Sequence, residues 1–441
     1  MQNRRGVFSW CLYDWANSAF MLIVVTGFFP LFFKSYYTGA SVGVVQTTAW
    51  LGLANTIAGA TIAVLSLVLG ALADFWVGKK RFLAVFIALG ALTTAALFFV
   101  AQGAWFTALA LFIVGNIGFS CANLFYDSLL VDVAEEKDMD FVSSMGFSFG
   151  YIGGVLLFVF CVWMMTHPAT FGLADEAMAV KVSFLCVAAW WTFFSVPLFL
   201  FVKEKRVRVP HPTVNLVINI VNAVRALGAI GRTFIAIIKN PTLLLFLIAY
   251  WLYFDGVNTF IRMAVNFGLS IGFQPNSLMA ALIVVQIIAF PSSLLFGYLA
   301  PKVGTGRMIM AGVVIYILIS SFGAFFMQTE THFIVLAGIS GIAQGGIQAL
   351  SRSYFGKQVP ADEATEYFGF YNVVSRFAVI GPAIIGITVV LAGGLGAQEA
   401  MASRIGMSSV NIFFISGLIV LIWAERVRKR ALMGKINERA P

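Results

Sequence analysis

The sequence has little charge. Only 11% of its 441 residues are Asp, Glu, Lys or Arg, whereas a soluble domain typically has about 25%. Sixty per cent are apolar, and the mean hydropathy is +0.93. Apolar runs of about 18 residues or more recur along the chain, and each is long enough to cross about 30 Å of hydrocarbon. A soluble globular protein is therefore excluded, and a polytopic helical membrane protein is predicted.

Signatures of catalysis and metal binding are also scarce. The sequence has no Walker loop, no H-E-x-x-H motif and no extramembrane domain that could house chemistry. Its four cysteines lie in apolar segments without a C-x-x-C pair, and its three histidines fall in three different loops. We therefore expect no enzyme, no cofactor and no metal site.

Hydropathy predicts twelve membrane spans. In the first half they are expected near residues 8–33, 47–73, 82–101, 104–131, 142–166 and 180–202. In the second half they are expected near residues 242–270, 276–300, 308–327, 332–356, 367–393 and 408–424. The stretch 213–240 is apolar too, but its polar residues recur on one helical face, which favours a helix lying in the headgroup region.

The distribution of Lys and Arg predicts the orientation. If the termini lie on one side of the membrane, only three Lys or Arg residues fall in loops on the other side, namely Lys34, Lys181 and Arg404. The positive-inside rule therefore predicts that both termini and residues 203–241 are cytoplasmic. The net charge of +9 therefore reflects the orientation in the membrane and does not indicate nucleic-acid binding.

Three internal echoes indicate two homologous halves. "YDWANSAF" (13–20) is echoed by "YFDGVNTF" (253–260), "GALAD" (70–74) by "GYLAP" (297–301), and "MGFSFGYIGG" (145–154) by "FGFYNVVSRF" (368–377). The echoes keep the same order in both parts of the chain. We predict an N-terminal six-helix half at 1–202, a basic cytoplasmic linker with an amphipathic helix at 203–241, and a C-terminal six-helix half with a basic tail at 242–441.

Two six-helix halves joined by a basic linker are typical of the major facilitator superfamily. The segment "GALADFWVGKKR" (70–81) resembles the signature loop of that superfamily between spans two and three. The sequence departs from the pattern by one additional residue before Gly78 and by Phe75, where arginine is common. The resemblance implies gating roles for Gly70, Asp74, Gly78, Lys79 and Arg81.

Longer motifs narrow the resemblance. "YDWANSAF", "SFGYIGG" and "GGIQALSRSYF", followed by "FGFYNVVSRFAVIGP", are similar to segments of the autophagy-related vacuolar effluxer family and its bacterial relatives. The likeness covers nearly the whole chain. For the fungal branch it implies export of amino acids from the vacuole. The short termini favour a prokaryotic member, a multi-pass protein of the plasma (inner) membrane.

Polar side chains inside the spans are the candidate substrate or ion site, because a charge at mid-bilayer costs about 2.5–3.5 kcal/mol on insertion scales. Asp14 and Asn17 share a face of span one and either bind a solute or cation or lock that span to a neighbour. Asp255 and Arg262 share a face of span seven, as a binding pair or as a structural salt bridge. The full set is Asp14, Asn17, Asp255, Asn258, Arg262, Gln344, Gln348, Tyr371, Asn372 and Arg376.

Two opposite charges occupy equivalent places in spans four and ten, where Asp127 aligns with Arg352. They predict a cytoplasmic gate in which the two side chains pair. Alternatively, the guanidinium of Arg352 binds a substrate carboxylate. The acidic cluster "EEKDMD" (135–140) is expected to be a solvated loop.

These features predict a secondary transporter that works by alternating access, with one solute site between the halves. The expected cargo is an amino acid or a related carboxylate. A proton or another ion would be coupled to it, through Asp14 or Asp255, because burial favours the protonated carboxyl. The alternatives are a lipid, amphiphile or drug translocase of the same fold and a non-transporting sensor or scaffold. Membrane lipids are expected as further partners, nucleic acid is not, and a monomer is expected.

Overall fold

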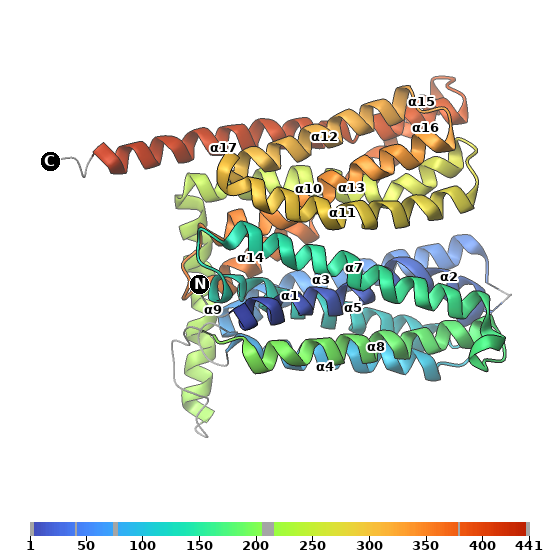
Figure 1. The fold of residues 1–441 in the computed structure, drawn as a ribbon, viewed down its shortest axis with the longest axis horizontal. Coiled ribbons are helices and arrows are strands. Elements are labelled where there is room, and N and C mark those ends of the chain that lie inside the picture. The colour runs from blue at the N-terminus through green and yellow to red at the C-terminus, as the bar shows by residue number, and fades with distance from the viewer. Residues whose placement is uncertain (1–3, 40–41, 74–77, 205–215, 378–379, 438–441) are drawn as a thin grey trace. The chain divides into compact units, whose positions relative to one another are not determined.

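The protein is helical over most of the residues that the structure describes. The computed structural model describes residues 4–39, 42–73, 78–204, 216–377 and 380–437 (Figure 1). Twelve helical segments are long and apolar enough to cross a membrane. The prediction of an all-α protein with twelve spans is therefore confirmed.

The first half supplies six of these spans. The first span comprises α1 (Arg4–Ala19), η1 (Phe20–Phe28), α2 (Phe29–Phe32) and η2 (Phe33–Tyr37). The next three contain α3 (Val44–Leu72), α4 (Lys79–Ala96) and α5 (Trp105–Ser128), and the short α6 (Leu130–Val133) follows. Spans five and six are α7 (Met139–Thr166) and α8 (Glu176–Phe201).

The second half repeats this order after the linker helix α9 (Leu216–Lys239). Spans seven to ten are α10 (Pro241–Ser270), α11 (Pro275–Val303), α12 (Thr305–Phe325) and α13 (Glu330–Gly356). Span eleven consists of α14 (Ala364–Arg376) and α15 (Ile380–Gly394), and α16 (Glu399–Ser408) precedes the last helix, α17 (Asn411–Asn437). Helix α9 is not among the twelve spans, and its location in the headgroup region stays a prediction.

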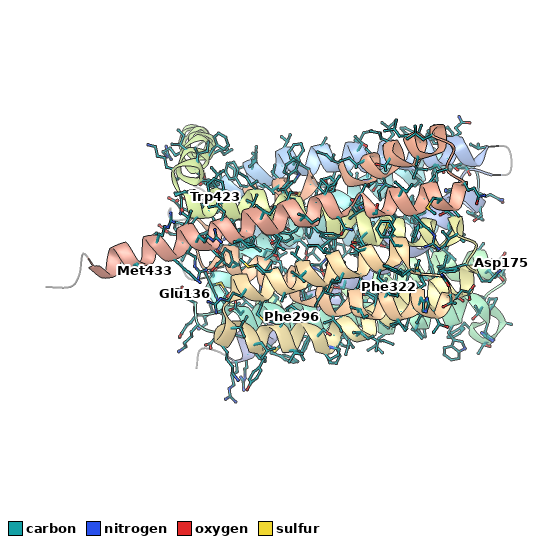
Figure 2. All side chains as sticks on the ribbon, turned by 90° about the horizontal axis from the view of Figure 1, so that it is seen from above. Glu136, Asp175, Phe296, Phe322, Trp423 and Met433 are labelled. Atoms are coloured by element: carbon teal, nitrogen blue, oxygen red, sulfur yellow. The ribbon has the colours of Figure 1, made fainter. Side chains whose placement is uncertain are left out.

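Large apolar side chains remain exposed along the spans. Phe322 of α12 is 42% exposed and Trp423 of α17 is 58% exposed (Figure 2). Small residues instead lie where helices meet, and a Cβ at Gly341 of α13 would be 2.6 Å from the Val285 carbonyl oxygen of α11. Apolar surface toward lipid and small residues between helices are the pattern of membrane bundles.

The helices form two compact units, each made of most of one half and a short segment of the other. Unit 1 contains Met1–Glu135, Gly146–Ile230 and Pro360–Asn372, and unit 2 contains Glu136–Met145, Gly231–Val359 and Val373–Pro441. We call residues 136–145 and 360–372 the crossover segments. The half boundaries at 202 and 242 stay a prediction, and the crossover segments are an additional feature that the sequence did not indicate.

Candidate functional site

The first-span motif ties α1 to α5 in unit 1. Asp14 and Asn17 are both buried. The Tyr126 hydroxyl donates a hydrogen bond to Asp14 Oδ2 at 2.7 Å, and Asn17 Nδ2 donates to Asn123 Oδ1 at 2.6 Å. The Trp10 ring stacks on Tyr126 with centroids 4.5 Å apart. This is the geometry of a lock between helices, one of the two roles that the sequence left open for Asp14, and ion binding there stays a prediction.

Helix α7 passes very close to Asp14. A Cβ at Gly146 would lie 2.7 Å from Asp14 Oδ2, and a Cβ at Gly150 would lie 3.2 Å from the Asp14 carbonyl oxygen. The letters G-F-S-F-G at 146–150 match the nucleophile-elbow pattern of hydrolases, but that elbow requires a strand-to-helix turn. Here the segment lies inside α7, so its glycines serve helix packing.

The signature loop leads into a buried ion pair. Gly78 has φ +87°, a left-handed conformation that favours glycine, and α4 begins at the next residue. Lys79 Nζ lies 2.7 Å from Asp132 Oδ2, and both side chains are at most 5% exposed. The Glu204 carboxylate accepts from the backbone N–H groups of Lys79 and Lys80 and thereby caps α4.

The other predicted residues of that loop differ in their surroundings. Gly70 packs so closely against the crossover segment 360–372 that a Cβ there would be 2.7 Å from the Thr365 carbonyl oxygen. Thr365 Oγ1 also donates to Ser128 Oγ at 3.3 Å. Arg81 is exposed. Asp74 lies outside the described residues.

The crossover segment 136–145 is anchored in unit 2 by Asp140. This carboxylate is fully buried and accepts hydrogen bonds from Thr305 Oγ1 at 2.8 Å and Ser353 Oγ at 2.6 Å. It also forms a 2.6 Å ion pair with Lys357 Nζ. The expectation that residues 135–140 form a solvated loop is therefore wrong for Asp140, because three side chains of the second half replace its water.

Arg352 strengthens the same contact. It is 2% exposed, and its Nε and Nη2 atoms donate to the side chain and carbonyl oxygens of Ser143, each at 2.9 Å. Ser143 Oγ in turn donates to the Ala349 carbonyl at 2.7 Å. Asp127 belongs to unit 1 and Arg352 to unit 2. Their predicted pairing stays a prediction.

Asp255 caps a helix of span eleven. It is fully buried in α10, and its carboxylate accepts from the backbone N–H of Ile380 at 3.1 Å and of Gly381 at 3.2 Å. Thr259 Oγ1 donates to the same carboxylate at 3.3 Å. A carboxylate at the start of a helix is favoured by the free N–H groups and by the helix dipole. Asp255 therefore fixes the start of α15 against α10.

The remaining predicted residues fall in both units. Asn258 is half-buried and Arg262 is exposed, and helical spacing places both on the α10 face that carries Asp255. Tyr371 and Asn372 are buried at the end of the crossover segment in unit 1. Three half-buried residues lie in unit 2, namely Gln344, Gln348 and Arg376. The structure therefore brings Asp255, Asn258 and Arg262 together and leaves Asp14 and Asn17 in the other unit.

Sequence reasoning missed the residues around Asp140, although a signal for them existed. The alignment that pairs Asp127 with Arg352 also pairs Ser128 with Ser353 and Asp132 with Lys357. Lys79 and Thr305 each follow a glycine of positive φ at the start of a helix.

Among the described residues, no group of three or more His, Cys, Asp or Glu could hold a metal.

Comparison with known proteins supplies relatives over nearly the full length. Residues 2–432 match the family described as vacuole effluxer Atg22 like. The chain is 39% identical to YxiO of Bacillus subtilis, an uncharacterized MFS-type transporter, over 94% of this chain and 93% of that one. It is 24% identical to autophagy-related protein 22 of Coccidioides immitis, over 74% of this chain and 65% of that protein.

Solved structures share the architecture at low identity. The proton:xylose symporter XylE, a member of the major facilitator superfamily, superposes with a TM-score of 0.69 at 11% identity, over 96% of this chain and 95% of that one. The human organic anion transporter MFSD10 gives a TM-score of 0.68 at 11% identity, over 96% and 100%. At such identities the likeness establishes the fold.

Proposed function

Because this chain belongs to the Atg22-like vacuole effluxer family and has the major facilitator fold, we propose that it carries a small carboxylate or zwitterion, such as an amino acid, by alternating access. Membership makes it a multi-pass membrane transporter. The substrate class, the coupling ion and the mode of access are our proposal.

The crossover segments are the observation that carries the proposal. Each is part of a span that begins in one unit and continues in the other, and each is held by buried polar contacts. A scaffold has no need of two such contacts at matching places of a repeat. In an alternating-access transporter they serve as latches that close one side of the path and release when it opens.

The number of spans determines which side of the membrane the latches share with the termini. Both latches lie where spans four and ten end and where spans five and eleven begin, which is the membrane side of the termini. We place the termini and residues 203–241 in the cytoplasm of a cell with the protein in its plasma membrane, so the latches close the cytoplasmic side. The excess of Lys and Arg in those segments supports this orientation.

The polar face of α10 supports the substrate class. Arg262 lies two turns from Asp255 on that face, with Asn258 between them. A guanidinium binds a carboxylate through two parallel hydrogen bonds. We assign the substrate carboxylate to Arg262, with Asn258 beside it, and the coupling charge to Asp255, for which a proton is the simplest partner.

A binding screen followed by uptake tests the proposal. The purified protein is screened by thermal shift against amino acids, organic acids, peptides and lysolipids, and stabilising compounds are tested for uptake into liposomes. We expect stabilisation by carboxylate-bearing solutes and uptake that Arg262→Gln abolishes. Arg307→Gln, at an exposed arginine near the start of α12, is the matched control and should transport normally. Stabilisation by lysolipids alone would instead support a lipid translocase.

A further inference from the structure

Span eleven is interrupted where it passes α10. In a continuous α-helix, the carbonyl of Phe377 would accept from the N–H of Gly381, four residues later. Here Trp251 Nε1 of α10 donates to the Phe377 carbonyl at 3.1 Å. The Gly381 N–H points to the Asp255 carboxylate, at 3.2 and 3.3 Å from its two oxygens. The Phe377 carbonyl and the Gly381 N–H, which would bond to each other in a continuous helix, are thus both bound by side chains of α10 instead.

The local sequence explains the interruption. Pro382 has no N–H and therefore cannot make the next bond of the helix. Gly381 lies so close to Thr259 that any larger residue would collide with the threonine side chain. Trp251 and Asp255 are four residues apart, so α10 presents both on one face. A donor for the free carbonyl and an acceptor for the free N–H are therefore matched to the interruption.

The interruption lies just beyond the point where span eleven changes unit. Residues 360–372 belong to unit 1, whereas Val373 and the following residues belong to unit 2. Span five changes unit at the same stage, between Met145 and Gly146, and yet α7 is continuous from Met139 to Thr166. In span eleven the change of unit falls inside α14, four residues before that helix ends at Arg376, and the helical bonds lost at Gly381 and Pro382 follow it.

We propose that Trp251 and Asp255 form a clamp that holds both ends of the interruption, so that α15 stays on α10 while residues 364–372 of α14 move with unit 1. The proposal rests on the alternating access proposed above and adds a mechanical role for one particular span. Trp251 is a positioning residue, because it acts through the backbone of span eleven and contacts no substrate. Pro382 keeps the span from closing into one rigid helix.

Hydrogen exchange measured by mass spectrometry tests the clamp without any substrate. Trp251→Phe removes the indole N–H and keeps an aromatic ring, and we expect amides in residues 377–384 to exchange about three- to tenfold faster, the effect of one neutral hydrogen bond. Trp190→Phe is the matched control, since the indole of Trp190 donates to the Trp15 carbonyl at 3.3 Å, away from span eleven. Unchanged exchange in Trp251→Phe, or an equal change in both variants, would overturn the clamp.

A second variant tests the interruption in the opposite direction. Pro382→Ala restores the missing N–H and should favour a continuous helix by about a hundredfold, the preference of a helix interior for alanine over proline. We expect slower exchange in residues 377–384 and a maximal transport rate at least about tenfold lower, with KM unchanged. Pro197→Ala, at the proline inside α8, is the control and should keep the wild-type rate.

The two readouts separate the two proposals. If the exchange changes occur as expected but no carboxylate solute is transported, the clamp stands and the proposed substrate class fails. If carboxylates are transported and Pro382→Ala transports at the wild-type rate with unchanged exchange, the clamp fails and the proposed function stands.

Discussion

The two units hold their crossover segments with different chemistry at equivalent places. In unit 2, the crossover segment itself brings the carboxylate, Asp140, which lies 2.6 Å from Lys357 Nζ. In unit 1, the ion pair of Lys79 with Asp132 lies within the first half, and the crossover segment brings the Thr365 hydroxyl to Ser128. We call these groups the unit-2 latch (Asp140, Thr305, Ser353, Lys357) and the unit-1 latch (Lys79, Ser128, Asp132, Thr365).

The comparison separates what the repeat conserves from what it does not. Both latches have a serine at the end of one span and a glycine that allows close approach, with Gly70 in one half and Gly297 at the aligned place in the other. The charges at one aligned place are opposite, because Asp132 in the first half aligns with Lys357 in the second. If the latches release as proposed, opening the unit-2 latch separates a buried ion pair, whereas opening the unit-1 latch separates packed backbone and neutral groups.

The largest expected effect is that of Asp140→Asn, which breaks the charge of the unit-2 latch. Removing one partner of a buried ion pair costs roughly 3–5 kcal/mol, and the 17% exposure of Lys357 favours the lower end. We expect much faster hydrogen exchange in residues 139–145 and a lower melting temperature. Asp175→Asn, at the exposed N-cap of α8 (Figure 2), is the control and should be close to neutral, because asparagine caps a helix about as well as aspartate. Equal effects of the two variants would contradict a buried latch.

Arg352 contributes the next effect on the same segment. Arg352→Gln removes the charge from two hydrogen bonds to Ser143 but keeps an amide N–H that can still donate one, so a loss of about 1.5–3 kcal/mol is expected and the same amides should exchange faster. If Asp127 pairs with Arg352, as predicted, Asp127→Asn should also favour the open cytoplasmic side, and a charge swap should restore part of the transport. Cysteine accessibility from each side measures the opening. Normal accessibility in both single variants with an inactive swap would contradict the pair.

The spans could be predicted because hydropathy is a local signal, whereas the latches depend on distant contacts. The depth of Asp255 and its repeat partner Asp14 identified it as a buried acid, but hydropathy cannot tell that it caps α15. The dipeptide Gly381-Pro382 was the available signal for an interruption. Likewise, Asp140 follows several acidic residues in a loop, and only its contacts with Thr305, Ser353 and Lys357 distinguish it from them.

Substitution of the packed glycine in each latch tests what the two latches share, because hydrogen exchange in both crossover segments should then increase to a similar extent. A Cβ at Gly70 would lie 2.7 Å from the Thr365 carbonyl oxygen, and one at Gly297 would lie 2.5 Å from Ser144 Cβ. Overpacking of this kind costs about 1–3 kcal/mol, so Gly70→Ala and Gly297→Ala should each speed hydrogen exchange in the crossover segment that they touch. Gly386→Ala, with no neighbouring atom within 4 Å of the new Cβ, is the control and should be neutral or stabilising. A response in one unit alone would show that the packing is not equivalent.

The smallest expected effect on a crossover segment is that of Asp132→Asn. The variant leaves Lys79 buried without its acid, so unit 1 as a whole should lose roughly 3–5 kcal/mol and melt at a lower temperature. The lost charge lies within the first half, however, and residues 364–372 keep the Thr365 hydroxyl and the close approach at Gly70. Their hydrogen exchange, measured well below the melting temperature, should therefore change less than that of residues 139–145 in Asp140→Asn. A joint replacement, Lys79→Met with Asp132→Leu, removes both charges and should recover part of the lost stability, because paired removal leaves no buried charge. If instead Asp132→Asn frees residues 364–372 as strongly as Asp140→Asn frees residues 139–145, the ion pair of unit 1 acts on its crossover segment too, and the difference between the latches is one of position and not of chemistry.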